Sequence, residues 1–453
     1  MYGLAGAKSN GRQCRRRCGG GRWYNKIMTK PVQPTAEETA VRVVRKLQES
    51  GYEAYFAGGC VRDKLMGLTP QDYDVATSAK PAEVGKLFPH SQKVGAVFGV
   101  VIVRRAGQVI EVATFRCDGP YADGRHPSQV TFATARQDAQ RRDFTCNGLF
   151  FDPIAGRLID YVGGQEDIGR KFLRAIGPPL ERFREDHLRM IRAMRFAARL
   201  GFSIDPATWD AIDELAAHIA TVSRERIGQE LRMLLTHPSR WTGVDLLAQS
   251  GLLDHFWPFP VKDRQVPARR DSWLGRLPAP SGFATALAAM VHDVSGLEMD
   301  PAYCGRRLQE ALALSGQEVQ DIGWFLAQLP LLGQWRNQRK ARLKRLLADV
   351  RCDDLVALYT AAETDAVEST GLPARLAELR REPIAPAPLV TGDDLISLGV
   401  RPGPRFKHWL EELYDRQLES EFPDRPSALR AAAELIHSAA KPQVGDSPRQ
   451  RRT

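Results

Sequence analysis

The stretch Ala57–Ala79 reads AGGCVRDKLMGLTPQDYDVATSA. A short predicted strand leads into Gly58-Gly59, and a helix is expected to start near Val61. Two glycines there let the backbone approach a ligand closely, and the helix start offers unpaired N–H groups to an anion. Arg62, in the first helical turn, adds a charged fork suited to phosphate. Many ordinary strand–helix turns share this pattern, so by itself it indicates phosphate binding only weakly.

Two acids in the same stretch, Asp72 and Asp74, sharpen that interpretation. They stand at the start of a predicted strand, where residues i and i+2 project from the same face. Two carboxylates held side by side repel each other and favour a cation between them. Mg²⁺ takes oxygen ligands, often one or two carboxylates plus substrate phosphates. The pair therefore predicts a Mg-nucleotide site, against the alternative of two acids in a solvated loop.

Two later stretches offer partners for such a site. Glu111, in the predicted strand VIEVATFR, is either a third catalytic carboxylate, as two-metal phosphoryl transfer often requires, or a surface strand acid. In QRRDFTCNGLFFD, Arg142 is a natural triphosphate partner and Asn147 a candidate for holding a ribose hydroxyl. The rival interpretation of that stretch is a capped helix with surface arginines.

The segment FREDHLRMIRAMRFAARLGF is predicted to be an amphipathic helix from Asp186 onwards. Asp186 and Arg189 are three residues apart and share one face of that helix, which Arg192 and Arg195 continue. This row is either a solvated charged face or a base-reading device. An aspartate accepts from an exocyclic amine and an arginine donates to a ring nitrogen or carbonyl, so the pair complements C or A. Opposite U or G the same groups stay unpaired.

Composition narrows the class of protein. The formal charge of +10 divides into +8 for residues 1–30, +3 for 441–453 and about −1 for the 410 residues between them, so charge is weak support for nucleic-acid binding. No stretch approaches the roughly 20 apolar residues of a membrane helix. Seven scattered cysteines do not form a disulfide framework, and the N-terminus lacks a secretory signal. The expected compartment is the cytoplasm.

Five motifs taken in order, GGCVRD, DYD, RRDFTCNG, DYVGG and EDHLRMIRAMRF, resemble the head and neck of class II tRNA nucleotidyltransferases and bacterial poly(A) polymerases. The similarity covers about Tyr52 to Leu235 and includes RERIGQELRMLL, which resembles the last neck motif. Order and number make the resemblance specific for the superfamily, but they do not separate its members.

The resemblance implies an α+β fold: a palm-like nucleotidyltransferase head with a mixed β-sheet, followed by an all-helical neck, body and tail. We expect the head at 31–170, the neck at 171–240 and the body and tail at 241–440. Residues 1–30 and 441–453 are expected to be disordered basic extensions.

The resemblance also implies roles for individual residues. Asp72 and Asp74 would bind Mg²⁺, and Asp186 and Arg189 would act as an amino-acid template for C and A. Together with Gly58 and Asn147, the implied nucleotide contacts are Gly59, Arg62, Arg142, Arg192 and Arg195. The RNA 3′-hydroxyl would attack the α-phosphate in line and pyrophosphate would leave, with positioning and metal electrostatics supplying most of the catalysis.

The partners implied are ATP, CTP and the 3′ end of a tRNA, and the leading activity is CCA addition. Poly(A) polymerase and partial CC or A addition remain alternatives, whereas the two intact aspartates speak against a non-catalytic RNA-binding relative. Asp123–Pro127 resembles part of the family's flexible loop. Cys146 and Gly148 replace the usual Ile and Ala, which predicts a slightly looser pocket. His292-Asp293 resembles a phosphohydrolase metal pair, but a helix end without metal is the favoured interpretation.

Overall fold

The structure, a computed structural model, describes residues 34–92, 99–118, 130–296, 299–363 and 366–440. The two basic extensions and the Asp123–Pro127 loop lie outside these residues. The chain divides into two compact units, Met1–Pro178 and Pro179–Thr453. The division falls eight residues beyond the predicted end of the head, and the finer boundaries at 240 and 440 stay predictions.

A seven-stranded mixed sheet forms the centre of the first unit, in the order β3-β4-β5-β2-β1-β8-β9. Its β2 and β5 strands run parallel, and the other neighbouring pairs run antiparallel. The strands of the sheet are β1 (Ala54–Ala57), β2 (Asp74–Thr77), β3 (Ser91–Gln92), β4 (Val100–Arg105), β5 (Gln108–Thr114), β8 (Phe150–Asp152) and β9 (Arg157–Ile159). Shorter strands are β6 (Arg116–Asp118), β7 (Val130–Phe132), β10 (Phe172–Leu173) and, in the second unit, β11 (Ser203–Ile204).

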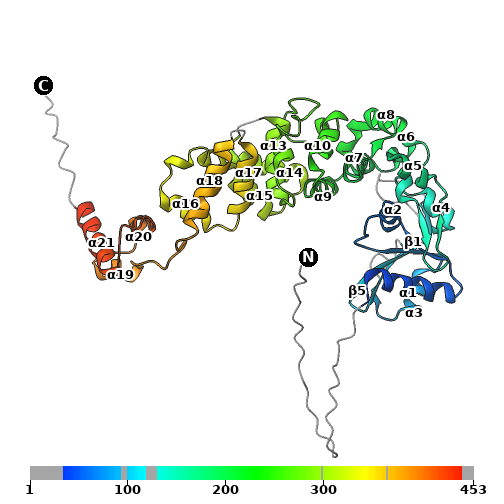
Figure 1. Cartoon of the computed structure of the whole chain (residues 1–453), viewed down its shortest axis with the longest axis horizontal. Helices are drawn as coiled ribbons and strands as arrows, with labels where there is room; N and C mark the ends of the chain where they lie inside the picture. The colour runs from blue at the N-terminus through cyan, green and yellow to red at the C-terminus, as the bar shows by residue number, and fades with distance from the viewer. Residues whose placement is uncertain (1–33, 93–98, 119–129, 297–298, 364–365, 441–453) are drawn as a thin grey trace, which may run out of the picture. The chain divides into compact units, whose positions relative to one another are not determined.

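Helices cover both faces of this sheet. They are α1 (Ala36–Glu49), α2 (Gly59–Leu65), α3 (Pro81–Leu87), α4 (Ala135–Gln140), the 3-10 turn η2 (Thr145–Asn147) and α5 (Gly164–Arg170). Helices α1 and α3 lie together on one face (Figure 1), where Val43, Val44 and Leu47 of α1 join the main core. On the other face Ala135 and Ala139 of α4 pack against Phe115 and Phe150. The capping box between Thr35 and Glu38 explains why α1 starts at Ala36.

The second unit is helical. Its elements are α6 (Pro179–Glu185), α7 (Leu188–Leu200), α8 (Pro206–Leu215), η3 (Ala216–Thr221), α9 (Arg224–Leu235), α10 (Arg240–Gln249), α11 (Leu253–Phe256), α12 (Trp273–Arg276), α13 (Phe283–Ser295), α14 (Pro301–Leu312), α15 (Gly316–Leu332), η4 (Trp335–Asn337), α16 (Lys340–Leu347), α17 (Cys352–Ala362), α18 (Ala366–Leu379), α19 (Gly392–Ser397), α20 (Pro404–Leu418) and α21 (Arg425–Ala440). Helices α19, α20 and α21 enclose a small core of their own around Leu395, Leu413 and Ala428.

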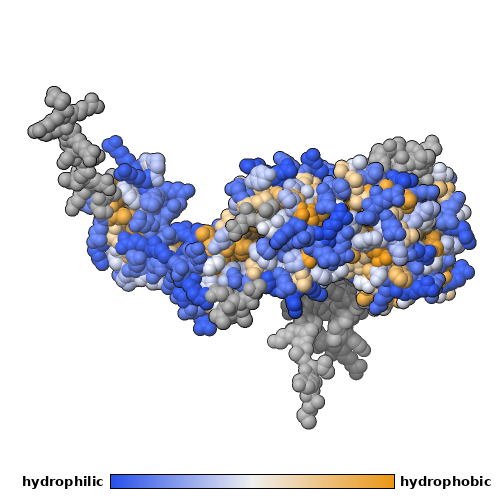
Figure 2. Space-filling model, turned by 90° about the horizontal axis from the view of Figure 1, so that it is seen from above, coloured by the Kyte–Doolittle hydropathy of each residue, from blue (hydrophilic) through white to orange (hydrophobic). Residues whose placement is uncertain are grey.

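The α+β head followed by helices is therefore confirmed, with one local correction. The predicted helix from Asp186 begins two residues later: α6 ends at Glu185, and α7 runs from Leu188 to Leu200. The face seen in Figure 2 is mostly hydrophilic, with hydrophobic residues in small separate areas. In the part of the chain that the structure describes, no helix has both the length and the apolar character needed to cross a membrane.

Candidate active site

The predicted glycine turn connects β1 to α2. Gly58 has φ 70° and ψ −127°, a backbone conformation that only glycine adopts readily. A Cβ at Gly58 would lie 3.0 Å from the Nη1 atom of Arg142, so an added side chain would collide with that guanidinium. The turn thus brings the backbone and one predicted phosphate partner close together, as the sequence interpretation requires.

Arg62 extends from the first turn of α2 into the protein and is only 3% exposed. Its Nη1 donates to the Oδ1 of Asn147 at 2.6 Å, and its Nε and Nη2 donate to Asp63. The Asn147 amide nitrogen in turn donates to Asp143 at 3.1 Å. Asn147 therefore orients Arg62, and a ribose hydroxyl would have to share atoms that already bond within the protein.

Arg142 follows the end of α4 and is held against its last turn. Its Nε and Nη2 donate to the Oδ2 of Asp138 at 3.2 and 2.9 Å, and its Nη1 donates to the backbone carbonyl of Asn147. Burial alone would raise the pKa of Asp138, but Arg142 and Arg141 outweigh burial and lower it. The guanidinium also lies 5.1 Å from the ring centre of Phe150. Arg142 is thus fixed in place by contacts on both sides of its guanidinium.

The predicted acid pair lies at the edge of this turn. Strand β2 begins at Asp74, which is in register with Glu111 on β5, so Glu111 joins the pair as the sequence allowed. Within the described residues the side chains of Asp72, Asp74 and Glu111 form no ion pair. Loss of hydration, then repulsion from Glu111, raises the pKa of Asp74 to about 6, with Arg142 acting the other way and Asp72 adding a little. This concentration of negative charge favours a bound cation.

A divalent ion fits the donors present there. Carboxylate oxygens are the ligands that Mg²⁺ prefers, and such sites are completed by substrate phosphates and water. Across the residues that the structure describes, no group of three or more His, Cys, Asp and Glu side chains is arranged to hold a metal by itself. The pair Asp72 and Asp74, completed by oxygens of a nucleotide, is the arrangement that these residues support.

In the second unit, Asp186 lies in the short break between α6 and α7. Its two carboxylate oxygens accept from the Nη1 and Nη2 atoms of Arg226, on α9, at 3.1 and 2.7 Å. The Asp186 Oδ1 also accepts from the backbone N–H of Leu188, which starts α7. The side chain is consequently fixed by a two-pronged ion pair rather than by a position within a helix.

Arg189 is buried close to the same break. Its Nη1 donates to the carbonyl of Arg182 at 2.8 Å and to the Oε2 of Glu185 at 2.6 Å. Asp186 and Arg189 are still neighbours in the chain fold, since the amide of Arg189 donates to the carbonyl of Asp186 at 3.1 Å. The two predicted template residues therefore stand together, each with its own internal partner.

One buried acid organises the other two predicted arginines. Glu230, on α9, is 3% exposed and accepts from Arg195 at 2.6 Å and from Arg192 at 3.2 Å. The sequence interpretation missed both Glu230 and Arg226. A signal existed: the two residues are four apart in RERIGQEL and so face the same side of α9.

The His292-Asp293 pair has a structural role at the end of α13. Asp293 accepts from the Ser272 hydroxyl at 2.6 Å and from the amides of Trp273 and Leu274 at 3.0 and 2.9 Å, which satisfies the start of α12. The His292 ring stacks on Trp273 with centres 3.6 Å apart. The carboxylate is thus already saturated by donors, in line with the helix-end interpretation.

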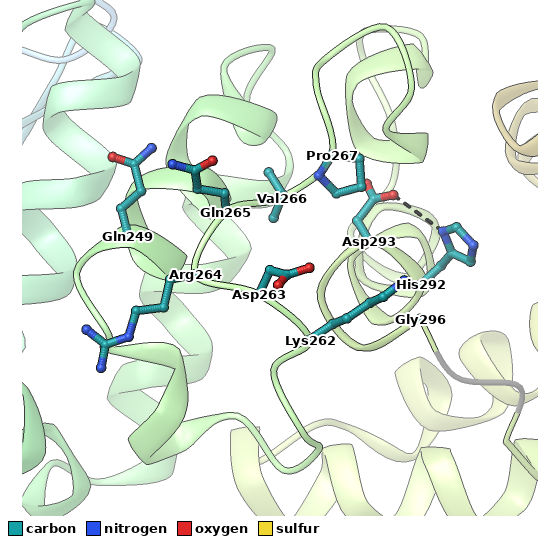
Figure 3. Close-up of a pocket in the computed structure, with 10 residues that line it drawn as sticks. All are labelled: Gln249, Lys262, Asp263, Arg264, Gln265, Val266, Pro267, His292, Asp293 and Gly296. Carbon is teal, nitrogen blue, oxygen red and sulfur yellow. Dashed lines mark hydrogen bonds and ion pairs between the residues drawn. The ribbon is translucent and has the colours of Figure 1, made fainter.

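Both residues border an open hollow of about 700 Å³ between α10 and α13. Figure 3 shows Asp263 pointing into it, Lys262 extending toward His292 and Arg264 pointing away. Arg264 pairs with Asp254 at 3.3 Å. Opposite charges share this hollow, so its lining does not select for an anion or for a cation.

The prediction of a looser pocket at Gly148 is wrong. A Cβ at Gly148 would lie 2.8 Å from Val162 and 3.0 Å from Ile176, so these side chains already occupy the space that an alanine would need. Cys146, the other departure, is fully buried. Neighbouring side chains compensate for the smaller residue, which a motif comparison does not reveal.

Comparisons with known proteins identify the family of this chain. Residues 54–174 match the family described as "Poly A polymerase head domain", and residues 201–262 match "Probable RNA and SrmB- binding site of polymerase A". The CCA-adding enzyme of Geobacillus kaustophilus is 35% identical over 411 residues, covering 87% of this chain and 96% of the relative. That of Geobacillus stearothermophilus is 33% identical over 414 residues, covering 88% and 97%.

Solved structures give the same result. The CCA-adding enzyme of Bacillus stearothermophilus in complex with CTP has a TM-score of 0.75 at 28% identity, covering 91% of this chain and 99% of that one. The Thermotoga maritima enzyme complexed with tRNA has a TM-score of 0.63 at 20% identity, a similarity of fold. With 35% identity along almost the whole length of a relative, the chain belongs to the family of CCA-adding enzymes, which are tRNA nucleotidyltransferases.

Proposed function

We propose that this chain adds the nucleotides C, C and A to the 3′ end of a tRNA, using CTP and ATP and releasing pyrophosphate. One observation carries the proposal: an acid pair that makes no ion pair with any described residue lies beside a glycine turn and two anchored arginines, in a member of the CCA-adding family. The relatives' solved structures include complexes with CTP, ATP and tRNA.

The first unit would hold the reacting phosphates. Without side chains at Gly58 and Gly59, a triphosphate would approach the backbone of the turn closely, and Arg142 supplies a fixed positive charge beside Gly58. Arg62 is buried, so we assign it mainly to shaping the turn through Asn147. A rigid frame of this kind lowers the entropy that positioning the phosphates would otherwise cost.

Nucleotidyltransferases of this family generally require a divalent metal ion. We propose Mg²⁺ with Asp72 and Asp74 as its protein ligands and Glu111 as the neighbouring acid. When bound, the ion would supply Lewis-acid stabilisation of negative charge on the phosphates. The chain's own contribution is to hold two carboxylates together, to fix the position of Arg142, and to aim the RNA 3′-hydroxyl at the α-phosphate so that pyrophosphate departs opposite it.

The second unit would select the base. Asp186 accepts from the exocyclic amine of C or A, and Arg189 donates to the adjacent ring nitrogen or carbonyl. Because Arg226 and Glu185 fix these side chains beforehand, neither can turn to suit the reversed donor and acceptor order of U or G. Arg192 and Arg195, joined by Glu230, would support the sugar or phosphates from the same helix.

We further propose that the neck at 171–240 carries selection and that the body and tail at 241–440 bind RNA. The match of residues 201–262 to a probable RNA-binding family supports this assignment.

Free cysteines at Cys60, Cys146, Cys304 and Cys352, all buried, support the cytoplasm as the working compartment.

The decisive experiment incubates purified protein with Mg²⁺, a tRNA transcript that lacks its terminal CCA, and each NTP singly and together. The RNA ends are then sequenced. We expect CCA when CTP and ATP are both present and no addition of U or G. Long A tracts would instead identify a poly(A) polymerase, the alternative that the head family's description favours, and CC or A alone would identify a partial enzyme.

A further inference from the structure

The first turn of α1 carries an acid that joins two elements of the candidate site. The Glu37 Oε2 accepts from the Tyr73 hydroxyl at 2.8 Å. Its Oε1 forms an ion pair with the Lys64 ammonium, from α2. Glu37 thus bonds to both the residue between the two aspartates and the helix that bears Arg62.

Tyr73 is the side chain that anchors the acid pair from behind. It is 5% exposed and lies in the main core with Val75, whereas Asp72 and Asp74 alternate onto the opposite face. Its ring meets the ring of Phe56 edge to face, with centres 5.3 Å apart. Any shift of Tyr73 along the strand would therefore move both carboxylates.

The sheet by itself does not hold this residue. Strand β2 begins at Asp74, and its register with β1 covers Phe56 to Ala54 against Val75 to Thr77. Asp72 and Tyr73 precede the hydrogen-bonded ladder, so their position depends on side-chain contacts. The Tyr73 hydroxyl, which donates to Glu37, is the polar side-chain contact of Tyr73 itself, while the Cys60 thiol donates to the Asp74 carbonyl at 3.9 Å and Asp74 pairs with Glu111 on β5.

Lys64 links the same point to the phosphate turn. Its ammonium lies 5.7 Å from the ring centre of Phe56 and 5.8 Å from that of Tyr73. Stacking on aromatic faces and pairing with Glu37 hold α2 against the strand start. One carboxylate consequently sets the spacing between the acid pair and the turn at Gly58.

We propose that Glu37 is a positioning residue of this enzyme: through Tyr73 and Lys64 it fixes the distance and direction of Asp72 and Asp74, and so the affinity for the metal-nucleotide complex. The inference rests on the proposed function, because it takes the two aspartates as metal ligands. Two adjacent carboxylates repel each other, and without an anchor the free strand start would relax away from the spacing that an ion needs.

The test measures metal binding directly. Free Mn²⁺ is followed by electron paramagnetic resonance while wild type and variants are titrated in the presence of a non-hydrolysable CTP analogue. Glu37→Ala should weaken Mn²⁺ binding about tenfold, as loss of a partner behind a metal ligand typically does. Tyr73→Phe, which removes only the hydroxyl and keeps the core, should weaken it by a smaller factor in the same direction.

The matched control is Glu38→Ala, one residue along. Glu38 caps α1 through the Thr35 amide and has no bond to β2 or α2, so its loss should lower thermal stability but leave Mn²⁺ affinity unchanged. Equal affinity losses in Glu37→Ala and Glu38→Ala would overturn the proposal. Should Glu37→Ala fail to fold, an unchanged affinity in Tyr73→Phe would overturn it equally.

The same titration separates this inference from the function on which it rests. If wild type binds Mn²⁺ in the presence of the analogue and Asp74→Asn does not, the metal site is supported, whatever the result for Glu37→Ala. If wild type and Asp74→Asn bind alike, the metal site itself is refuted, and the positioning role with it.

Discussion

Asp74 in the first unit and Asp186 in the second are both expected to contact the nucleotide, yet the protein holds them in opposite ways. Asp74 has Glu111 beside it and makes no ion pair among the described residues, and its pKa is raised to about 6. Asp186 is gripped through both oxygens by Arg226. The Asp74 carboxylate is therefore available to bind a cation, whereas the Asp186 carboxylate is held by Arg226 in the absence of a ligand.

The contrast corresponds to two different tasks. The triphosphate is the same in every NTP, so the unit that binds it needs charge and room rather than discrimination. Bases differ only in the order of donors and acceptors, so choosing among them requires side chains that cannot turn. We infer that the uncompensated carboxylate of Asp74 suits metal binding and that the paired carboxylate of Asp186 suits base selection.

The largest expected effect is that of Asp74→Asn. Nucleotide addition to tRNA should fall at least about 1,000-fold, because a neutral amide cannot replace a carboxylate ligand of the metal. The raised pKa of Asp74 also predicts how this residue affects folding stability. Asp74 stabilises the metal-free protein below about pH 4, and this contribution is lost as the pH rises through about 6.

Because Asp74 is exposed, solvent screens part of this effect, and Asp74→Asn should raise the melting temperature of the metal-free protein at pH 8 by only about 1–2 °C, a gain that should shrink toward pH 4. Calorimetry at the two pH values measures it. A clear loss of stability at pH 8 would show that Asp74 is paired within the protein, and the contrast with Asp186 would disappear.

Asp186→Ala should change base choice more than rate. The ratio of kcat/KM for CTP to that for UTP should drop by about tenfold or more, since the amine acceptor is gone and Arg226 is released. Single-nucleotide kinetics on tRNA ending before the CCA measure this ratio. Arg184→Ala is the control: its 3.7 Å pair with Glu214 is exposed, so selectivity should be unaltered. Unchanged selectivity in Asp186→Ala would exclude the template role.

Low pH should lower the rate of nucleotide addition by protonating Asp74, and Glu111 should affect the pH at which this loss occurs. At subsaturating metal, kcat/KM should fall about tenfold per pH unit below about 6, as Asp74 becomes protonated. Glu111→Gln removes part of the repulsion and should move the inflection to lower pH, though loss of hydration keeps the pKa above its ordinary value. A pH–rate profile that Glu111→Gln leaves in place would show that the two acids do not interact.

The smallest effect expected is that of Gly148→Ala. The added Cβ meets Val162 and Ile176 at 2.8 and 3.0 Å, so the free energy of unfolding should fall by about 1–2 kcal/mol. Denaturant melts of the purified protein measure the change. Val162→Ala in the same chain should restore part of the loss, while Gly169→Ala, with open space around it, should be neutral or stabilising. If Gly148→Ala left the free energy of unfolding unchanged, the prediction of a looser pocket at Gly148 would stand again.

Local patterns predicted the elements well wherever short-range chemistry decides them. Helix α1 runs from Ala36, where its capping box stands, and β1 at Ala54–Ala57 leads into Gly58-Gly59, as the β-forming residues before the glycines predict. The start of α7 shows the limit of such patterns. Asp186 is predicted to be the first residue of the helix, but its side chain accepts from the amide of Leu188, so it stands just before the helix.

The sequence by itself determined the chemistry of this protein: which acids alternate to one face, where glycine permits a tight turn, and the order of motifs that marks the family. Only the tertiary structure decided the partners. Arg226 lies 40 residues from Asp186, and Glu37 lies 36 residues from Tyr73. Local spacing fixes the direction of a side chain within its own element, whereas the neighbour across a packed interface depends on how whole elements are assembled.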